Sequence, residues 1–456
     1  MNPAEDHLVA MIVAYVALVL AVLLFFLKKK TPTVGMPVAY TFNLFMYHFF
    51  GGLIYAFPWW QNDNYENVYL GFRETLYGMA AFAFGTIVLV PFFVRHFLTS
   101  PKSTEISPPI NLPSRYLLIG LLFYIVGGKC LVSIPSIATF VQSGWYLLLT
   151  AVCLFCWKAW LKGEKWKVLL WIAVSMLFPF FTTFNSGFLG LGTVALMSIL
   201  FFVSVFFKPR WLIIPAILLS IYMGLSLCVT YFRDRGELRE ALWYNQASKT
   251  ESIERTMSTL SNFEFLDFFN EKHLIRIDGR LNQNTQVGKC IIFMRDGGAP
   301  FAHGETLWEA VTALIPRILW PGKPVLIGTT DEVTKYTGEV FNDSTTVSMG
   351  QVMEFYVNFG TPGVIICYLI FSVVVFCFDY KASAALLRGD WKKFTFWFLP
   401  GLGFMLSIDG FVSITGSVVS AMIFCFLIHR YLLKSFLPKA RRTRVRGLEK
   451  KFLPKT

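Results

Sequence analysis

Apolar segments close to 20 residues long recur along almost the whole of this 456-residue chain. A helix needs about 20 apolar residues to cross the hydrocarbon core of a bilayer, so segments of this length predict transmembrane helices. The composition agrees, because 55% of the residues are hydrophobic and only 15% are charged. The sequence therefore predicts an all-α polytopic membrane protein.

We count eleven predicted spans. The first is a span rather than a secretory signal, because its apolar run is long and its amino end carries Glu5 and Asp6 in place of basic residues. The spans are expected near residues 8–27, 36–57, 75–94, 116–140, 144–161, 168–187, 189–207, 211–230, 362–379, 394–410 and 412–433.

Basic residues gather in every second short connection, beginning with Lys28, Lys29 and Lys30 after the first span. Positive connections stay in the cytoplasm, so these are predicted to be cytoplasmic. The basic tail after Arg430 places the C-terminus inside as well. With an odd number of spans, the N-terminus is then outside.

One long polar segment, Tyr231 to Thr346, interrupts the apolar pattern. The chain divides into eight spans (1–230), a large extracytoplasmic loop with short helices (231–349), a pre-membrane helix with three spans (350–433) and a cytoplasmic tail (434–456). The loop has 13 basic and 16 acidic residues, so the net charge of +13 lies in the cytoplasmic parts. That distribution favours attraction to anionic membrane lipids and gives no reason to expect nucleic-acid binding.

The sequence indicates no cofactor and no metal. Of the eight cysteines, only Cys290 lies outside the predicted spans, so no disulfide is expected in the loop. Asp63 and Glu66 in the first external loop are the nearest approach to an acidic metal site, and no histidine or carboxylate motif with ligand spacing accompanies them.

The loop contains two segments with clear helical signals. Thr306 to Glu309 reads as a capping box at the start of an amphipathic helix, which Pro316 breaks. Met349 to Phe359 predicts a short helix that ends at Gly360. Glu354 and Asn358 then share one face of this second helix.

Three loop segments, in this order, resemble the motifs of bacterial oligosaccharide repeat-unit polymerases, the Wzy-type O-antigen and exopolysaccharide polymerases. They are Gly279–Gln283, Ile315–Pro324 and Glu354–Gly360. Arg317 and Gly328 also match an Arg-x10-Gly spacing of that family. The resemblance covers residues 279–363 at the level of motifs. The odd number of spans departs from the commoner even arrangement.

The resemblance implies a multi-pass protein of the bacterial inner membrane, with an architecture like that of GT-C glycosyltransferases. It implies a glycosyltransferase that moves an oligosaccharide from undecaprenyl diphosphate to the non-reducing end of another lipid-linked unit. The product belongs to polysaccharide biosynthesis, such as lipopolysaccharide, and a chain-length regulator protein is an implied partner.

A diphosphate leaving group at the edge of the membrane needs cations placed in advance. Arginine suits this role, because its guanidinium group is always charged and binds phosphate oxygens in pairs. Arg280 and Arg317 are the leading candidates, followed by Arg295 and Lys323. Lys129, inside the fourth span, is a further candidate, because an ammonium group in lipid needs an anion or must reach the surface.

The alternative for the loop arginines is pairing with neighbouring carboxylates on a solvated face. Such exposed pairs contribute about 0–1 kcal/mol to stability. The acidic neighbours are Asp278, Asp296 and Glu309.

The sugar hydroxyl that attacks needs a base, and Glu354 is the first candidate, followed by Glu305 and His303. Each also has an ordinary alternative: ion pairing for Glu354, a charge at a helix N-terminus for Glu305 and a solvated loop position for His303. Asn185 lies near the outer end of the sixth span and Asp409 between the tenth and eleventh. Both could line the cavity, but turn and capping roles are the simpler expectation. Two rival classes stay open, an O-antigen ligase and a transporter or flippase.

Overall fold

The computed structural model describes most of the chain. The described residues are 3–28, 32–60, 62–92, 111–127, 135–186, 189–207, 213–239, 257–259, 261–315, 328–342 and 347–433, with residues 320, 322 and 345. All regular secondary structure in these residues is helical. The predicted all-α class is therefore confirmed.

The helices fall into three groups along the chain. The first group contains α1 (Pro3–Lys28), α2 (Met36–Ile54), α3 (Tyr65–Phe84) with η1 (Gly85–Leu89), α5 (Leu112–Leu121) with η2 (Leu122–Gly127), α7 (Pro135–Leu161), α8 (Lys165–Ser175), α9 (Phe178–Ser186), α10 (Leu189–Phe206) and α11 (Ile213–Arg239). The second contains α13 (Glu271–Leu281), α14 (Gln283–Arg295), α15 (Glu305–Ala313) and α16 (Thr329–Thr337). The third contains α17 (Gln351–Leu387), α18 (Trp391–Gly401) with η5 (Leu402–Met405) and α19 (Phe411–Leu427) with η6 (Ile428–Leu432).

Several of these helices suit a membrane. In the described residues, seven segments are long and apolar enough to cross one: His7–Lys28, Tyr65–Phe92, Phe140–Leu161, Lys165–Thr182, Ile217–Gly236, Gln351–Leu387 and Phe411–Leu432. Two shorter apolar helices, Leu112–Ile125 and Gly190–Phe206, accompany them. Helical residues occur in each of the eleven predicted ranges. The number of crossings stays a prediction, whereas the character of a helical membrane protein is supported.

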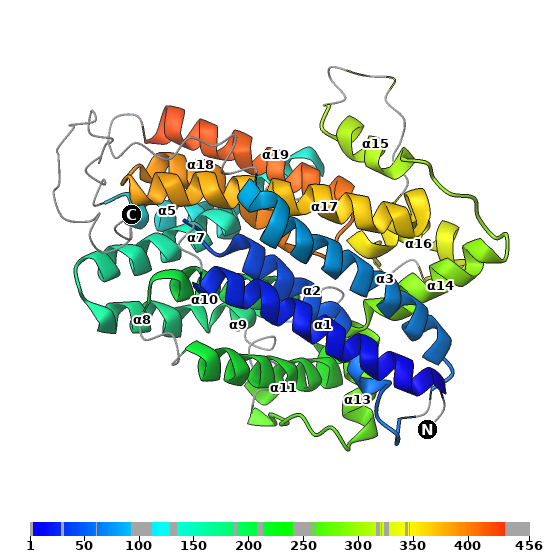
Figure 1. Ribbon diagram of the computed structural model, residues 1–456. Helices are drawn as coiled ribbons and strands as arrows, with labels where there is room; N and C mark the ends of the chain where they lie inside the picture. The colour runs from blue at the N-terminus through cyan, green and yellow to red at the C-terminus, as the bar shows by residue number, and fades with distance from the viewer. Residues whose placement is uncertain are drawn as a thin grey trace.

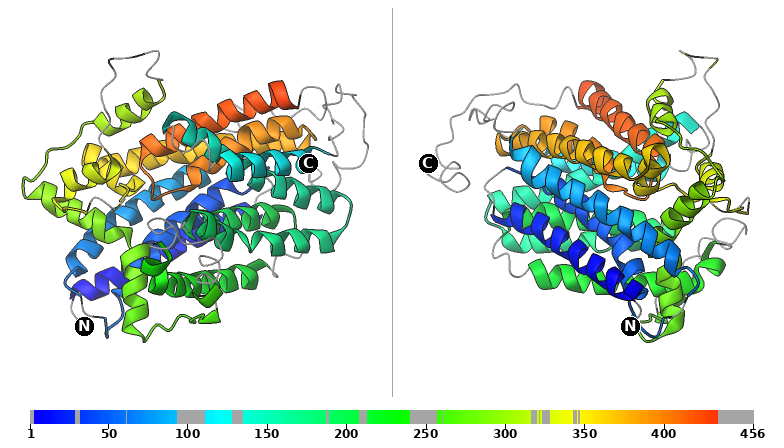
Figure 2. Two further views of the ribbon diagram at one scale, coloured as in Figure 1. Left: turned by 180° about the vertical axis from the view of Figure 1, so that it is seen from behind. Right: turned by 45° about the vertical axis from the view of Figure 1, so that its right-hand side comes forward.

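The long helices run side by side as one bundle, and the loop helices gather at one end of it (Figures 1 and 2). α13, α14 and α16 lie at the end where α1 begins, whereas the α7–α8 and α17–α18 turns lie at the opposite end. The α7–α8 turn contains Lys162, and α8 begins at Lys165. The polar loop helices and this basic turn are therefore separated by the length of the bundle.

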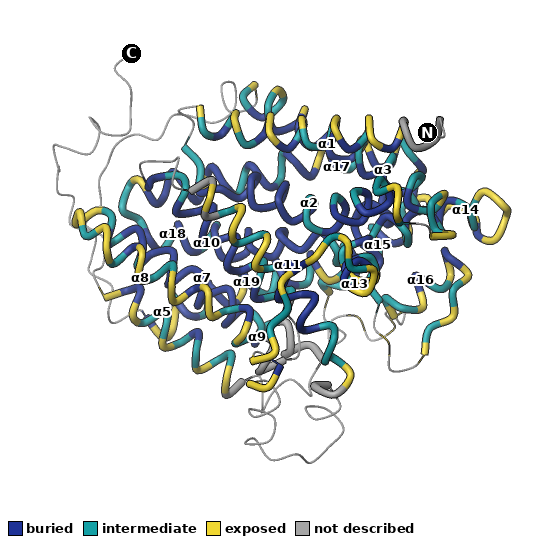
Figure 3. Tube along the Cα trace, turned by 90° about the horizontal axis from the view of Figure 1, so that it is seen from below, coloured by how far each residue is buried: buried dark blue, intermediate teal, exposed yellow. Residues whose placement is uncertain are grey.

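Exposed residues lie mainly on the outer helices, while the middle of the bundle is buried (Figure 3). Val13 of α1 and Leu218 of α11 are 63% and 61% exposed. Phe265, which precedes α13, is 59% exposed and stacks on Tyr222 of α11. Large exposed apolar surfaces are rare on proteins in water, so these faces fit contact with lipid.

α17 is two helices joined by a kink. Phe359 and Gly360 leave helical geometry, and Gly360 has a positive φ of 65°, which glycine adopts at little cost. Pro362 then opens the second part, where its missing N–H removes no helical bond. The predicted pre-membrane helix ending at Gly360 is present.

α14 packs directly on α3 through glycine. A Cβ atom on Gly288 would lie 1.9 Å from the Asn67 carbonyl oxygen, and one on Gly71 would lie 2.0 Å from that of Asn284. Only glycine allows the two backbones to approach so closely. The carbonyl of His48 in α2 accepts a 2.7 Å hydrogen bond from the Asn284 amide, so α14 is also bonded to α2. These contacts hold the α13–α14 corner against the bundle.

Candidate functional site

A cavity of about 1150 Å³ lies between the loop helices and the bundle. Its wall is apolar where α2, α9, α10 and α11 supply it, through Phe42, Met46, Phe180, Leu191, Met197, Leu219 and Ile221. Its polar end is formed by Arg235, Asp278, Arg280, Gln283, Gln286, Lys289 and Glu339, and Asp409 also lines the cavity. Such a division fits a ligand with an apolar tail and a polar head.

Arg280 occupies the last turn of α13, at the polar end of the cavity. The Asn270 side chain caps the start of this helix by accepting a bond from the Lys272 amide. At its other end, the Asn282 amide donates to Asp278 at 2.6 Å and to Thr285 at 3.0 Å. Hydrogen bonds from the flanking residues Asn270 and Asn282 therefore hold both ends of α13, and the second of them holds the turn that carries Arg280.

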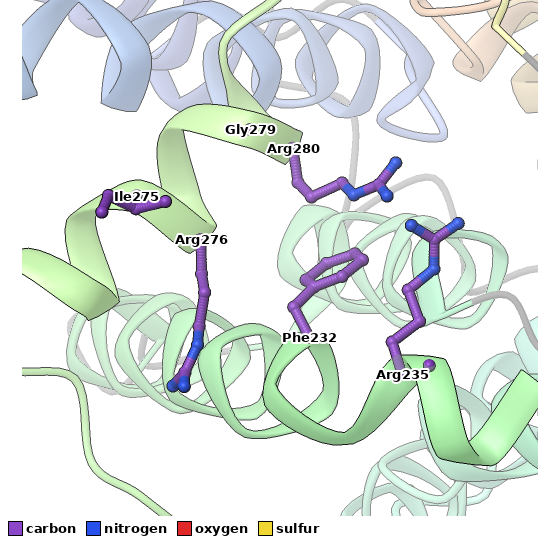
Figure 4. Close-up of a pocket in the computed structure, with 7 residues that line it drawn as sticks. Phe232, Arg235, Ile275, Arg276, Gly279 and Arg280 are labelled. Carbon is purple, nitrogen blue, oxygen red and sulfur yellow. The ribbon is translucent and has the colours of Figure 1, made fainter. Parts of the chain in front are cut away.

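Arg235, from the end of α11, faces the same space as Arg280 (Figure 4). The guanidinium carbons of Arg280 and Arg235 lie 4.9 Å and 5.4 Å from the centre of the Phe232 ring. Within the described residues, neither arginine forms a salt bridge with a carboxylate. Two like charges without an acidic partner make this end of the cavity suitable for an anion. Sequence analysis missed Arg235, because no motif surrounds it.

Two other arginines beside this space are already paired. Glu264 accepts from Arg233 at 2.7 Å and from Arg276 at 3.1 Å, and Figure 4 shows Arg276 turned away from Arg280. Bonding to Arg233 lowers the pKa of the Glu264 carboxyl, so this group stays charged. Arg233 and Arg276 thus tie α11 to α13, which leaves Arg235 and Arg280 available.

Four further residues are predicted to bind the diphosphate. One of them lies within the described residues and three lie outside them. Arg295 is exposed on α14, where it lies 3.8 Å from Glu66 and 3.3 Å from Asp296. Arg295 does not line the cavity. Its partner Asp296 is one of the acidic neighbours expected if the loop arginines only form ion pairs. Arg317, Lys323 and Lys129 lie outside the described residues.

Glu354 and Asn358 share one face of α17 as predicted, and that face packs against α15 and α19. Glu354 is 1% exposed and accepts a 2.7 Å hydrogen bond from the Phe411 amide at the start of α19. Asn358 accepts from the Gly304 amide at 2.9 Å and donates to the Thr306 hydroxyl at 2.7 Å. Neither residue lines the cavity that contains Arg280.

The Thr306 contact corrects the predicted capping box. α15 begins at Glu305, its N-cap is Gly304 with a positive φ of 93°, and no side chain caps it. Thr306 is buried inside the first turn, where its hydroxyl accepts the bond from Asn358. A distant asparagine therefore replaces the local partner that the motif predicts.

Glu305 and His303 lie beside Glu354 at the start of α15. The Glu305 carboxylate is exposed and 3.7 Å from the Lys335 ammonium group. His303 is exposed, has a positive φ of 47° and donates its backbone N–H to the Asn358 carbonyl. The structure thus gathers the three predicted acid–base residues in one place, and neither His303 nor Glu305 lines the cavity of Arg280. Their catalytic roles stay predictions.

Asp409, which the sequence allows to line the cavity or to serve in a turn, is one of its acidic lining residues. It lies in the turn between η5 and α19. Burial raises the pKa of its carboxyl to about 6, although a hydrogen bond from Ser413 acts in the opposite direction. Among the described residues, no group of three or more histidines, cysteines or carboxylates is arranged to hold a metal ion.

Comparison with known proteins places the chain in a family. No curated protein and no solved structure matches it significantly. The model of a family described as a domain of unknown function, DUF8712, matches residues 33–436. The match spans α2 to η6 and includes every residue of the cavity. The chain therefore belongs to the DUF8712 family.

Proposed function

We propose that this protein is a membrane glycosyltransferase that polymerises oligosaccharide repeat units carried on undecaprenyl diphosphate. It joins the glycan of one lipid-linked unit to the non-reducing end of another, without a metal ion. The observation that carries the proposal is the cavity with an apolar wall and, at its polar end, two arginines that form no salt bridge with a carboxylate of the described residues.

The cavity matches the two halves of such a substrate. A polyprenyl tail needs apolar surface, which α9, α10 and α11 supply, and a diphosphate needs fixed cations, which Arg235 and Arg280 supply. The volume of about 1150 Å³ exceeds the roughly 300–1,000 Å³ of common small-molecule pockets. There is thus space for a headgroup larger than a single sugar.

The motif resemblance supports the sugar-transfer part of the proposal. Gly279–Gln283 contains Arg280, and the side chain of Asn282 in the same segment bonds Asp278 in the last turn of α13. Arg317, Lys323 and Lys129 are proposed as further contacts to the diphosphate. A chain-length regulator is the proposed protein partner, and the product is an O-antigen or an exopolysaccharide.

The proposed orientation follows the basic connections. Eleven spans place the N-terminus and the loop of residues 231–349 outside the cytoplasm of a bacterial cell, and the C-terminus inside. Reporters fused after Lys30, Lys165 and Lys381 are expected to read cytoplasmic, and a fusion within the loop is expected to read external. A cytoplasmic loop would remove the mechanism, because the lipid-linked units are used on the outer face.

The function is tested with purified protein in liposomes that contain undecaprenyl-diphosphate-linked repeat units and no other acceptor. Wild type is expected to produce a ladder of longer lipid-linked chains. Arg280→Ala is expected to produce none, and Arg280→Lys little, because lysine lacks the planar fork. Lys272→Ala, which removes an exposed cation of the same helix outside the cavity, is the matched control.

Two other outcomes would contradict a polymerase. Transfer only after a lipid A core is added would identify a ligase. Movement of the lipid-linked unit across the bilayer, without a new glycosidic bond, would identify a flippase.

A further inference from the structure

We propose that Asp409 is the general base that takes the proton from the attacking sugar hydroxyl. This inference rests on the proposed function, and it assigns a catalytic role to a residue for which the sequence favours a turn or a cap over a place in the cavity. The carboxylate belongs to the same cavity as the arginine pair, whereas Glu354 does not.

The turn that carries Asp409 is held rigidly. Asn43 of α2 accepts from the Ser407 amide at 2.9 Å, and the Ser407 carbonyl accepts from Gln351 at 3.1 Å. On the other side, the Gly410 amide donates to the Ser348 hydroxyl at 3.3 Å. Asp409 itself uses its backbone N–H within the turn, toward the Leu406 carbonyl. These bonds fix the backbone from which the carboxylate extends, and a base needs such a fixed support.

The same turn is joined to the helix pair that carries Arg280. The Gln286 amide of α14 donates to the Ser348 carbonyl at 3.2 Å, and Ser348 in turn bonds Gly410. A Cβ atom on Gly350 would lie 3.5 Å from both the Gln283 side-chain oxygen and the Ser407 carbonyl. Arginine and carboxylate therefore belong to one connected wall of the cavity.

The groups around the carboxylate leave it available as a base. Within the described residues, no lysine, arginine or histidine forms a salt bridge with Asp409. The carboxylate accepts a hydrogen bond from Ser413 of α19, and its charge also acts on the phenol groups of Tyr47 in α2 and Tyr146 in α7. With a pKa near 6, the carboxyl is ionised at neutral pH and more basic than an ordinary aspartate.

Glu354 lies on the other side of the same helix start. The Oε2 atom of Glu354 accepts a hydrogen bond from the backbone amide of Phe411, the residue after Gly410. The Glu354 side chain is buried among protein atoms. The two carboxylates thus flank the amino end of α19, with Glu354 bonded to the protein and Asp409 facing the cavity.

The proposed reaction transfers one proton to Asp409 and exchanges one bond at the anomeric carbon of the donor. The acceptor hydroxyl loses its proton to Asp409 as its oxygen bonds to the anomeric carbon of the donor. The bond from that carbon to the diphosphate oxygen breaks, and its electron pair leaves with the lipid diphosphate beside Arg235 and Arg280. The proton then passes from Asp409 to water, which restores the carboxylate.

The test compares Asp409→Asn with wild type in the liposome assay. We expect the rate of chain elongation to fall about 10²- to 10⁴-fold, while binding of undecaprenyl diphosphate is unchanged. Asp409→Glu, which keeps a carboxylate, is expected to retain more activity than Asn. Wild type should lose activity as the pH falls through about 6, because the Asp409 carboxylate becomes protonated. In Ser413→Ala the same loss should occur at a higher pH, because the substitution removes a hydrogen bond to the charged form.

The matched control is Glu271→Gln, an exposed carboxylate on α13 outside the cavity. Full elongation by Asp409→Asn would overturn the inference and leave the proposed function intact. Loss of elongation in Glu354→Gln but not in Asp409→Asn would assign the base to Glu354 instead. Asp409→Asn protein that neither elongates nor binds undecaprenyl diphosphate, with Asp409→Glu equally inactive, would make Asp409 structural. Absence of transfer by wild type would overturn the proposed function first.

Discussion

The polar end of the cavity and the start of α15 both contain polar and charged side chains. The two regions differ in whether those side chains have partners within the protein. At the start of α15, Asn358 and Thr306 bond each other, and Glu354 accepts from a backbone amide. In the cavity, Arg235 and Arg280 share one aromatic ring and pair with no carboxylate of the described residues. Polar groups that the fold has satisfied hold the structure together, whereas unsatisfied charges are available to a ligand.

The contrast also concerns cost. Two guanidinium groups held near one another repel, and an anion bound between them would offset this repulsion. The buried bonds of Asn358 carry no such cost, because each amide atom has a partner. Four substitutions measure the difference, beginning with the largest expected effect.

Arg235→Ala should reduce chain elongation about 10²- to 10³-fold, the usual loss when one fixed donor to a developing anion is removed. Its melting temperature should match wild type, since the guanidinium group makes no salt bridge to a described carboxylate. Elongation in liposomes and thermal unfolding in detergent measure the two quantities. Wild-type elongation would show that Arg235 only covers Phe232.

Gly288→Ala should destabilise the protein by about 1–3 kcal/mol or more, because the new Cβ atom would meet the Asn67 carbonyl at 1.9 Å. α14 would have to move away from α3. Gly416→Ala is the matched control, since nothing lies within 4 Å of its Cβ position. Equal melting temperatures for the two variants would contradict the close packing.

Asn358→Ala should cost about 1–3 kcal/mol of stability by leaving the Gly304 amide without its acceptor. The loss in melting temperature should be accompanied by a smaller fall in elongation per folded molecule than Arg235→Ala produces. A large loss of rate with unchanged stability would instead move the α15 region into the reaction.

Glu332→Gln should have the smallest effect, and it depends on pH. Burial, followed by the nearby charges of Glu354 and Glu309, raises the pKa of Glu332 to about 8. Because the folded pKa lies above the unfolded one, wild type loses stability as the pH rises from about 4.5 to about 8. Glutamine removes this loss, so the variant should melt higher than wild type above pH 8. Parallel melting curves across this range would show Glu332 to be ionised at neutral pH.

Local patterns predicted the parts of this molecule that depend on neighbouring residues. The helical class and the break at Gly360 follow from composition and from short-range geometry. Arg280 follows from its motif, and the structure places it in the cavity. The capping box failed because Thr306 has a better partner 52 residues away.

The sequence by itself determined that the chain forms apolar helices with a polar insertion, because helix formation and membrane partition depend on residues within one or two turns. Only the tertiary structure decided which charges form no salt bridge among the described residues. Arg235 and Arg280 come from α11 and α13, and Asp409 comes from a turn more than a hundred residues later. Whether a charged side chain meets a partner or an open cavity depends on such distant contacts, and no local pattern contains them.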